Sequence, residues 1–250
     1  MNFLRPDWPA PARVRAATTT RQGGVSQPPF DSFNLGGHVG DAPAAVAANR
    51  QQLRKSLSLP GEPYWLNQIH GTTVVNLDTS PEGVPEADAS ITTIEGTVCA
   101  VLTADCLPVL FCDQAGTQVA AAHAGWRGLA AGVLEATVKS FTSPPEKIMV
   151  WMGPAIGPQA FEVGDEVRQA FCNHDPAAAE AFTATKPESN EKKWLADVYQ
   201  LAQQRLAAVG VKNIYGGGRC TFTEADEFYS FRRDGKTGRM ASLVWIEAKV

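Results

Sequence analysis

Three side chains that can bind a metal ion or react as nucleophiles lie on three separate segments of the chain. Cys106 lies in an apolar run that begins at Val98, and His123 ends the next apolar run. His70 lies in an earlier β-rich segment and is followed by Gly71. Two imidazoles and one thiolate are good Zn²⁺ ligands, and three protein ligands leave a fourth position for water or substrate. These residue types therefore allow a catalytic metal site if the fold brings them together.

The same residues allow two other kinds of chemistry. Cys106 and His123 could form a thiolate–imidazolium pair in which Cys106 is the nucleophile and Asp105 orients a partner. Copper also accepts two His ligands and one Cys ligand, but a multicopper oxidase needs far more than the 4 His of this chain. The spacing of the residues leaves both the metal site and the Cys–His pair open.

Arg127 follows His123 in the segment His-Ala-Gly-Trp-Arg-Gly. The pattern predicts a helix from Leu129 to Phe141, and a cation at the positive end of a helix is disfavoured. A bound anion would relieve this, because helix N-termini bind phosphate well. We therefore predict that Arg127 helps to hold phosphate or a phosphorylated substrate. The alternative is an ion pair with a carboxylate such as Asp105 or Asp88.

The elements that must position these residues alternate irregularly between strand and helix patterns, which favours a mixed α+β fold over strict α/β alternation. A Gly/Pro-rich loop follows the first strand, and the segment from Asn173 to Asn190 is expected to be exposed. Besides the two apolar runs, strands are predicted at Val14–Thr20, Lys147–Met152, Val211–Tyr215 and Met240–Ala248, and two β-rich runs around His70. Helices are predicted at Ala42–Leu57 (with Asp41 as N-cap), Leu129–Phe141, Gly164–Cys172 and Lys193–Val209.

The composition is that of a globular protein, with 44% hydrophobic and 19% charged residues. The net charge of -4 and the lack of long basic runs argue against a nucleic-acid partner. We see no signal peptide and no apolar run that could span a bilayer, so we expect no membrane association and a cytoplasmic location. The 5 Cys form no Cys-x-x-Cys pair and are expected to be reduced. No repeat or linker divides the chain, so residues 1–250 are predicted to form one domain.

Four motifs resemble those of the YfiH-type laccase-domain family, whose members are also described as purine nucleoside phosphorylases, polyphenol oxidases and peptidoglycan editing factors. The resemblance runs from the Thr18 segment to the C-terminus. The motifs are Asn67-Gln-Ile-His70-Gly71, Thr103-Ala-Asp-Cys106-Leu-Pro, His123-Ala-Gly-Trp-Arg-Gly128 and Phe228-Tyr-Ser-Phe-Arg-Arg-Asp-Gly.

The resemblance implies a single α+β domain, a layered α-β-β-α sandwich with mixed sheets, and a zinc ion held by His70, Cys106 and His123. It implies phosphorolysis of adenosine, inosine, guanosine and methylthioadenosine, with adenosine deamination as a side activity and no obligate protein partner. Asp105 and Asn34 are candidates for contacts with the ribose or the base. The alternatives are a peptidoglycan-precursor editing factor, a Cys–His hydrolase and a copper polyphenol oxidase.

Overall fold

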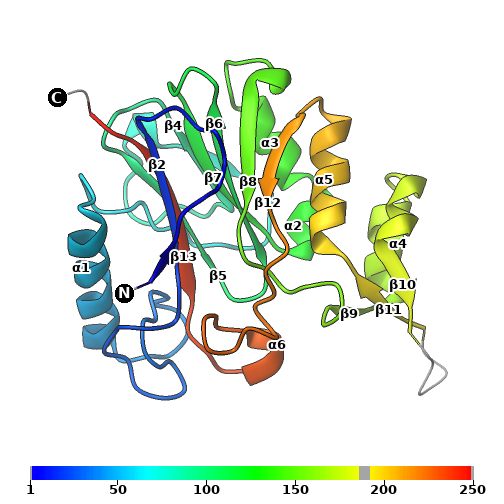
Figure 1. The fold of residues 1–250 in the computed structure, drawn as a ribbon, viewed down its shortest axis with the longest axis horizontal. Coiled ribbons are helices and arrows are strands. Elements are labelled where there is room, and N and C mark those ends of the chain that lie inside the picture. The colour runs from blue at the N-terminus through cyan, green and yellow to red at the C-terminus, as the bar shows by residue number, and fades with distance from the viewer. Residues whose placement is uncertain (1, 186–191, 249–250) are drawn as a thin grey trace.

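Two β-sheets packed face to face form the centre of the structure, a computed structural model that describes residues 2–185 and 192–248 (Figure 1). The four-stranded sheet is antiparallel and contains, in spatial order, β1 (Phe3–Leu4), β2 (Val14–Thr19), β13 (Met240–Ile246) and β5 (Val98–Thr103). The six-stranded sheet contains β12 (Asn213–Gly216), β8 (Ile148–Met152), β6 (Leu107–Asp113), β7 (Val119–Ala124), β4 (Ala89–Thr92) and β3 (Val74–Asn76). This second sheet is mixed, because β12 pairs with β8 and β3 with β4 in parallel.

Helices cover the outer face of each sheet. Helix α1 (Pro43–Leu57) lies on the four-stranded sheet, whereas α2 (Trp126–Ala131), α3 (Val133–Lys139) and α5 (Val198–Ala208) lie on the six-stranded sheet (Figure 1). The predicted α+β class and the layered α-β-β-α arrangement are therefore confirmed. None of the helices within the described residues is long and apolar enough to cross a membrane.

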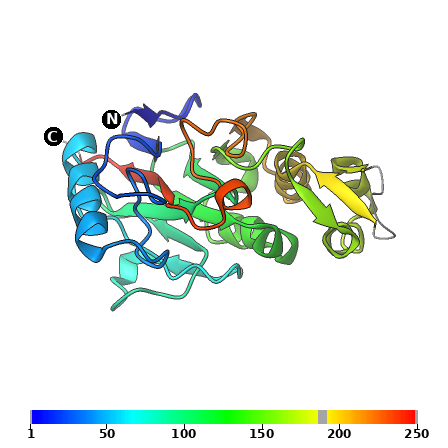
Figure 2. The same ribbon diagram turned by 90° about the horizontal axis from the view of Figure 1, so that it is seen from below.

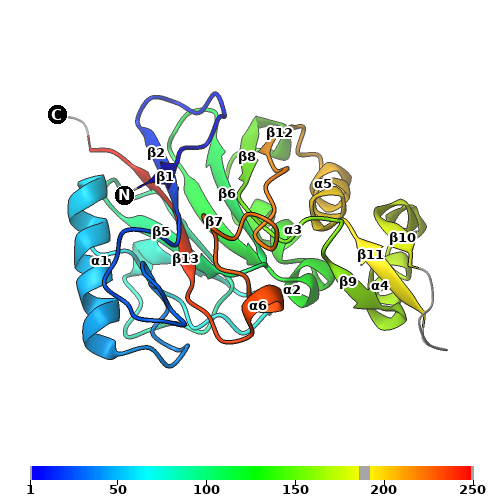
Figure 3. The same cartoon turned by 60° about the horizontal axis from the view of Figure 1, so that its bottom comes forward.

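A smaller unit projects from the side of the sandwich that carries α5 (Figure 2). It contains α4 (Asp165–Cys172) and a three-stranded antiparallel sheet of β10 (Phe182–Ala184), β11 (Lys193–Ala196) and β9 (Glu162–Gly164). A short helix, α6 (Phe231–Asp234), lies instead at one end of the two central sheets (Figure 3).

The apolar run that contains β6 is buried on both of its faces. Val109 and Phe111 contribute to the core beneath the helices, while Leu110 and Cys112 contribute to the core between the two sheets. Side chains of a strand alternate between its faces, so a strand with two buried faces has no polar alternation. Full burial of each large apolar side chain contributes about 1.5–3 kcal/mol. This explains why the sequence shows an uninterrupted apolar run here.

Three predicted elements differ from the structure. The N-cap of α1 is Ala42 rather than Asp41, because the Asp41 carboxylate accepts hydrogen bonds from Ser26 and Asn34 in the preceding loop. The helix predicted at 129–141 begins earlier and is divided in two at Gly132, whose φ of 104° is left-handed.

The helix predicted at 193–209 is wrong in its first part. Residues 193–196 form β11, paired with β9, and the helix begins only after Asp197, whose carboxylate caps it. The segment predicted to be an exposed excursion contains the turn of 3₁₀ helix Pro176–Ala181 and strand β10, and its residues 186–190 lie outside the described part of the chain. The other predicted helix and strands outside the His70 region differ from the structure only at their ends.

We predict that packing between the two sheets limits the stability of the fold. Leu110 is fully buried there, so Leu110→Ala should lower the free energy of unfolding by about 2–5 kcal/mol in urea titrations. Val84 is 63% exposed, and Val84→Ala should change the free energy of unfolding by no more than about 0.5 kcal/mol. Equal effects of the two substitutions would show that the sheets are not tightly packed.

Candidate metal centre

His70, Cys106 and His123 meet in space at one end of the two sheets. One potential ligand atom from each lies within 4.8 Å of the other two. The Cys106 Sγ atom is 3.9 Å from His70 Nε2, and the centroids of the two imidazole rings are 4.8 Å apart. His123 is buried, Cys106 is half-buried and His70 is exposed. The predicted set of three ligands is therefore assembled with one side open.

The sheets bring two of the three residues together. His123 is in β7 opposite Pro108 of β6, so Cys106, just before β6, lies beside the residues that follow His123. Cys106 itself belongs to the tight turn between β5 and β6, where Asp105 has a φ of 91°. An antiparallel register thus places the thiol next to the imidazole.

His70 reaches the site from a turn rather than from a strand. Its φ is 62°, a left-handed conformation that few residues other than glycine adopt. Of the two β-rich runs predicted around it, only β3 forms a regular strand, while Tyr64 and Asn67 make isolated bridges. The irregular backbone turns His70 toward Cys106.

A buried carboxylate, Asp88, holds this turn and His123 in place. It accepts hydrogen bonds from the backbone N–H groups of Ile69 (3.2 Å), His70 (2.9 Å) and Gly71 (2.6 Å). It also accepts a 2.8 Å hydrogen bond from His123 Nδ1. Because Nδ1 is engaged in this way, Nε2 of His123 is left to bind a metal, as in carboxylate–histidine–metal arrangements.

The charge of Asp88 is stabilised by these contacts. Burial raises the pKa of the carboxyl group, but the hydrogen bonds from His123 and from the turn outweigh it and lower the pKa below its usual value. The sequence offers Asp88 only as an alternative ion-pair partner of Arg127. The signal for its larger role is its position between two alanines at the start of a buried strand, where a carboxylate needs several donors.

Two glycines allow the His70 turn to lie against α2. A Cβ atom on Gly125 would come within 2.7 Å of His70 Cδ2 and 3.0 Å of Cys106 Sγ. A Cβ atom on Gly128 would lie 2.9 Å from the carbonyl oxygen of Gly71. The spacing of these glycines after His123 is therefore a steric requirement of the site.

Cys106 and His123 stabilise each other's charged forms, the thiolate and the imidazolium. Burial alone would raise the pKa of the Cys106 thiol, but the neighbouring His123 lowers it to about 6. Burial likewise opposes protonation of His123, yet Cys106 and Asp88 raise its pKa to about 9. At neutral pH the metal-free pair is thus a thiolate and an imidazolium.

The three residues line a cavity of about 250 Å³. Its other walls come from the end of β5 and from four polar or aromatic side chains: His38, Gln68, Phe231 and Arg239. The amide of Gln68 exchanges two 2.8 Å hydrogen bonds with the backbone of Leu102 and so fixes one wall. A larger hollow of about 580 Å³ beside the N-terminal segment contains none of the three candidate ligands.

Arg127 lies outside this cavity wall. Its side chain is exposed and stacks on the ring of Trp126, with 4.4 Å between the guanidinium carbon and the ring centroid. Helix α2 begins at Trp126, so Arg127 is within its first turn rather than before it. The role of Arg127 in holding phosphate stays a prediction.

Asp105 supports the cavity through two other segments of the chain. Its carboxylate accepts hydrogen bonds of 2.6 Å from the Thr221 hydroxyl and of 2.6 Å from the backbone N–H of Arg232 in α6. It thereby ties α6 to the turn that carries Cys106. A contact between Asp105 and a substrate stays a prediction.

Asn34 is fully buried and its amide is engaged with protein groups. The amide oxygen accepts hydrogen bonds from the backbone N–H groups of Gly36 and Arg239, both at 2.9 Å, and the amide nitrogen donates to Asp41. Asn34 therefore positions the segment that carries Arg239. Its predicted contact with a substrate is likewise untested.

Comparison with known proteins places this fold and site in one family. Residues 15–247 match the family described as multi-copper polyphenol oxidoreductase laccase. The chain is 58% identical to a purine nucleoside phosphorylase of Pseudomonas aeruginosa and 58% identical to the purine nucleoside phosphorylase YfiH of Escherichia coli, over 98% of each chain. The chain therefore belongs to the laccase-domain family. Within that family it is of the YfiH type.

Solved structures of the family share the fold. A Neisseria meningitidis protein aligns with a TM-score of 0.93 and 54% identity, covering 99% of this chain and 100% of that one. YlmD of Geobacillus stearothermophilus aligns with a TM-score of 0.87 and 32% identity, covering 99% and 97%.

We predict that Asp88 controls metal affinity. In Asp88→Asn, an amide NH₂ group would replace one of the carboxylate oxygens that accept hydrogen bonds from the His70 turn and His123. Loss of such a supporting carboxylate typically weakens metal binding about 10- to 100-fold. Competition with a chromophoric chelator would measure the Zn²⁺ affinity of the variant and of the wild type.

Asp78→Asn is the matched control, because Asp78 accepts hydrogen bonds from Thr92 and Thr93 and lies away from the three ligands. Equal Zn²⁺ affinity in the Asp88 variant and the wild type would contradict the role of Asp88.

Metal binding should also release protons in a pH-dependent way. A bound His123 must be neutral, so Zn²⁺ displaces the imidazolium proton while the pH is below the pKa of about 9. At neutral pH the pair should release about one proton. The number should rise as the pH falls through about 6, because Cys106 is then also protonated. It should fall as the pH rises through about 9, because His123 is then already neutral. Calorimetry in buffers of different ionisation enthalpy would count the protons. The same number below pH 6, at neutral pH and above pH 9 would contradict these two pKa values.

Proposed function

We propose that this protein is a zinc-dependent purine nucleoside phosphorylase that acts on adenosine, inosine, guanosine and methylthioadenosine, with adenosine deamination as a side activity. The observation that carries the proposal is the open set of His70, Cys106 and His123 on the wall of a cavity. The names of relatives that are 58% identical support the phosphorylase activity.

The three residues fit a zinc ion. Ligand atoms of tetrahedral zinc lie about 3.3 to 3.6 Å apart, given Zn–N bonds of about 2.0–2.1 Å and Zn–S bonds of about 2.3 Å. The Sγ–Nε2 distance is 3.9 Å between Cys106 and His70, and all three ligand atoms lie within 4.8 Å of one another, so binding requires the side chains to move inward. The thiolate character of Cys106 and the support of His123 by Asp88 suit the same ion.

Zinc bound to these residues would supply a Lewis acid for phosphate or water at the open position. Phosphorolysis forms a bond between a phosphate oxygen and ribose C1′ and breaks the C1′–N bond, whose electron pair leaves with the purine. The chain contributes a fixed ligand set, held by Asp88, and a cavity whose walls are fixed by the hydrogen bonds that Gln68 exchanges with Leu102 and that Asp105 accepts from Thr221. Such fixed walls would position the two substrates relative to each other.

Two other functions have an observation in their favour. The lowered pKa of Cys106 beside His123 is what a cysteine hydrolase requires of its nucleophile. The description of the matching family favours a copper polyphenol oxidase, and a His₂Cys site accepts copper. Editing of peptidoglycan precursors is the remaining alternative, and a Cys106→Ala chain that still corrects a cell-wall defect would favour it.

Removal of the metal should abolish nucleoside cleavage. The wild type should convert inosine to hypoxanthine only when phosphate is present, should lose this activity in a chelator and should regain it with Zn²⁺. Cys106→Ala should lack both metal, measured by elemental analysis of protein purified without added metal, and activity. Cys172→Ala is the matched control, since Cys172 lies in α4, outside the cavity.

The alternatives give different results in the same assay. Hypoxanthine release that needs neither metal nor phosphate would exclude the proposed phosphorylase. Full activity in a chelator, together with trapping of Cys106 by iodoacetamide, would indicate the cysteine hydrolase. Copper as the bound metal, with oxidation of phenols, would indicate the oxidase.

A further inference from the structure

The cavity wall that faces the three candidate ligands comes from the C-terminal part of the chain. Arg239, just before β13, and Phe231, the first residue of α6, both line it. Figure 3 shows α6 and the start of β13 at the same end of the sheets. Neither residue was singled out as a ligand contact from the sequence, because both are far from His70 and His123 along the chain.

Arg239 is a half-buried cation: burial lowers the pKa of its guanidinium, and the negative charges of Cys106 and Asp105 oppose this. Its Nη1 donates to the carbonyl oxygens of Thr237 (3.1 Å) and Gly238 (3.0 Å). Within residues 2–185 and 192–248, no ion pair involves Arg239, whereas the buried Arg205 pairs with Glu135. A half-buried guanidinium that makes no direct ion pair gains stability when a ligand places an anion in contact with it.

The backbone and stem of Arg239 are held rigidly. Its N–H donates to Asn34 Oδ1 at 2.9 Å, and its carbonyl oxygen accepts from Leu35 at 3.2 Å. Its Cγ lies so close to Gly36 that a Cβ atom there would be only 2.8 Å away. The guanidinium is therefore presented to the cavity before any ligand binds, which reduces the entropy lost on binding.

A second arginine, Arg50, acts on this side of the cavity through its effect on His38. Burial lowers the pKa of His38, and the charges of Arg239 and Arg50 lower it further. Arg50 is anchored by two hydrogen bonds to the carbonyl oxygen of Leu35 and stacks on Trp65. Phosphate fits such a surface, because the planar guanidinium donates two parallel hydrogen bonds to phosphate oxygens.

Phe231 offers an apolar ring face next to this cation. It is 58% exposed although it is a large aromatic residue, and the guanidinium carbon of Arg239 lies 5.8 Å from its ring centroid. Asp105 fixes the start of α6 by accepting from the N–H of Arg232. An exposed aromatic ring in a cavity can stack with a nucleobase, since every base has a flat π-face.

We propose that Arg239 binds the phosphate co-substrate and that Phe231 stacks on the purine base. The proposal rests on the proposed function and names the residues that hold each of its two substrates. It assigns the phosphate to Arg239 rather than to Arg127, which is exposed and lies outside the cavity wall.

Steady-state kinetics of the zinc-loaded full chain would test the assignment. Arg239→Gln should raise the KM for phosphate about 10- to 100-fold, the effect of losing a hydrogen bond to a charged group, and should leave the KM for inosine within about twofold. Phe231→Ala should do the reverse, raising the KM for inosine about tenfold and leaving the KM for phosphate unchanged. A merely structural role of either residue would change both constants together.

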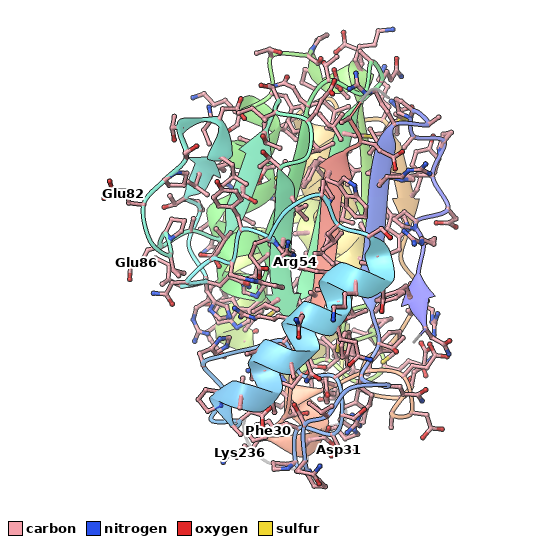
Figure 4. The ribbon with its side chains drawn as sticks, turned by 90° about the vertical axis from the view of Figure 1, so that its left-hand side faces the viewer. Phe30, Asp31, Arg54, Glu82, Glu86 and Lys236 are labelled. Carbon is pink, nitrogen blue, oxygen red and sulfur yellow. The ribbon has the colours of Figure 1, made fainter. Side chains whose placement is uncertain are left out.

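Conservative and control variants sharpen the test. Arg239→Lys keeps the charge but loses the planar pair of donors, and Phe231→Leu keeps apolar bulk but loses the ring, so each should show an intermediate rise. Arg54→Gln removes one positive charge from the outer surface of α1, where Figure 4 shows Arg54, and should change neither KM. Zinc content and thermal unfolding would confirm that each variant is folded and loaded.

Calorimetry with inorganic phosphate separates this proposal from the proposed function. Zinc-loaded wild type and Arg54→Gln should bind phosphate equally, and Arg239→Gln should bind it at least about tenfold more weakly, even if no nucleoside is cleaved. A loss of phosphate binding in Arg127→Gln with none in Arg239→Gln would overturn the assignment, as would equal changes in both KM values. Wild type that binds phosphate through Arg239 but cleaves no nucleoside would contradict only the proposed function.

Discussion

The hydrogen bonds to the Asp88 carboxylate are the interaction on which the site depends. This one buried anion joins a left-handed turn, which carries His70, to a strand, which carries His123. A buried carboxylate is stable only when several donors surround it. The donors that stabilise Asp88 are the His70 turn and His123, which must also be held in place for metal binding. The hydrogen bonds that offset the cost of burying the carboxylate therefore also fix the ligands.

The packing of two sheets explains why the site lies at an edge of the molecule. Val119 and Ala121 lie on the same face of β7 as His123 and belong to the core between the sheets, and His123 comes at the end of that core. There the sheets no longer cover each other, and turns and loops from other parts of the chain close the gap. At the end of the molecule where Figure 4 labels both residues, Lys236 lies over the Phe30 ring, 5.3 Å from its centroid.

The chemistry of the site follows from the contrast between its two walls. One wall carries the thiol and the two imidazoles, while the other carries a half-buried guanidinium and an exposed aromatic ring. A metal ion on the first wall and an anion on the second would lie across a cavity of about 250 Å³, so both substrates of a phosphorylase could meet between them. A cysteine hydrolase would use the ligand wall alone, which is why chelation and phosphate dependence distinguish these functions.

Much of the fold was predictable because long buried strands leave a strong apolar pattern, as in β6 and β7. The pattern failed where tertiary contacts override local preference: residues 193–196 continue a helical pattern but pair with β9, and Gly132 divides a helix that periodicity alone would continue. Local sequence cannot report these outcomes, since the partner strand lies elsewhere in the chain.

The sequence by itself determined the chemical nature of the site: two imidazoles, one thiol, the glycines that allow their approach and the motifs that indicate the family. Only the tertiary structure decided which residues surround them. Asp88 became the central support, Arg239 and Phe231 entered the cavity, and Arg127 was left on the surface. The physical reason is that residue type is a property of each position, whereas the register of strands and the packing of loops decide which distant positions meet.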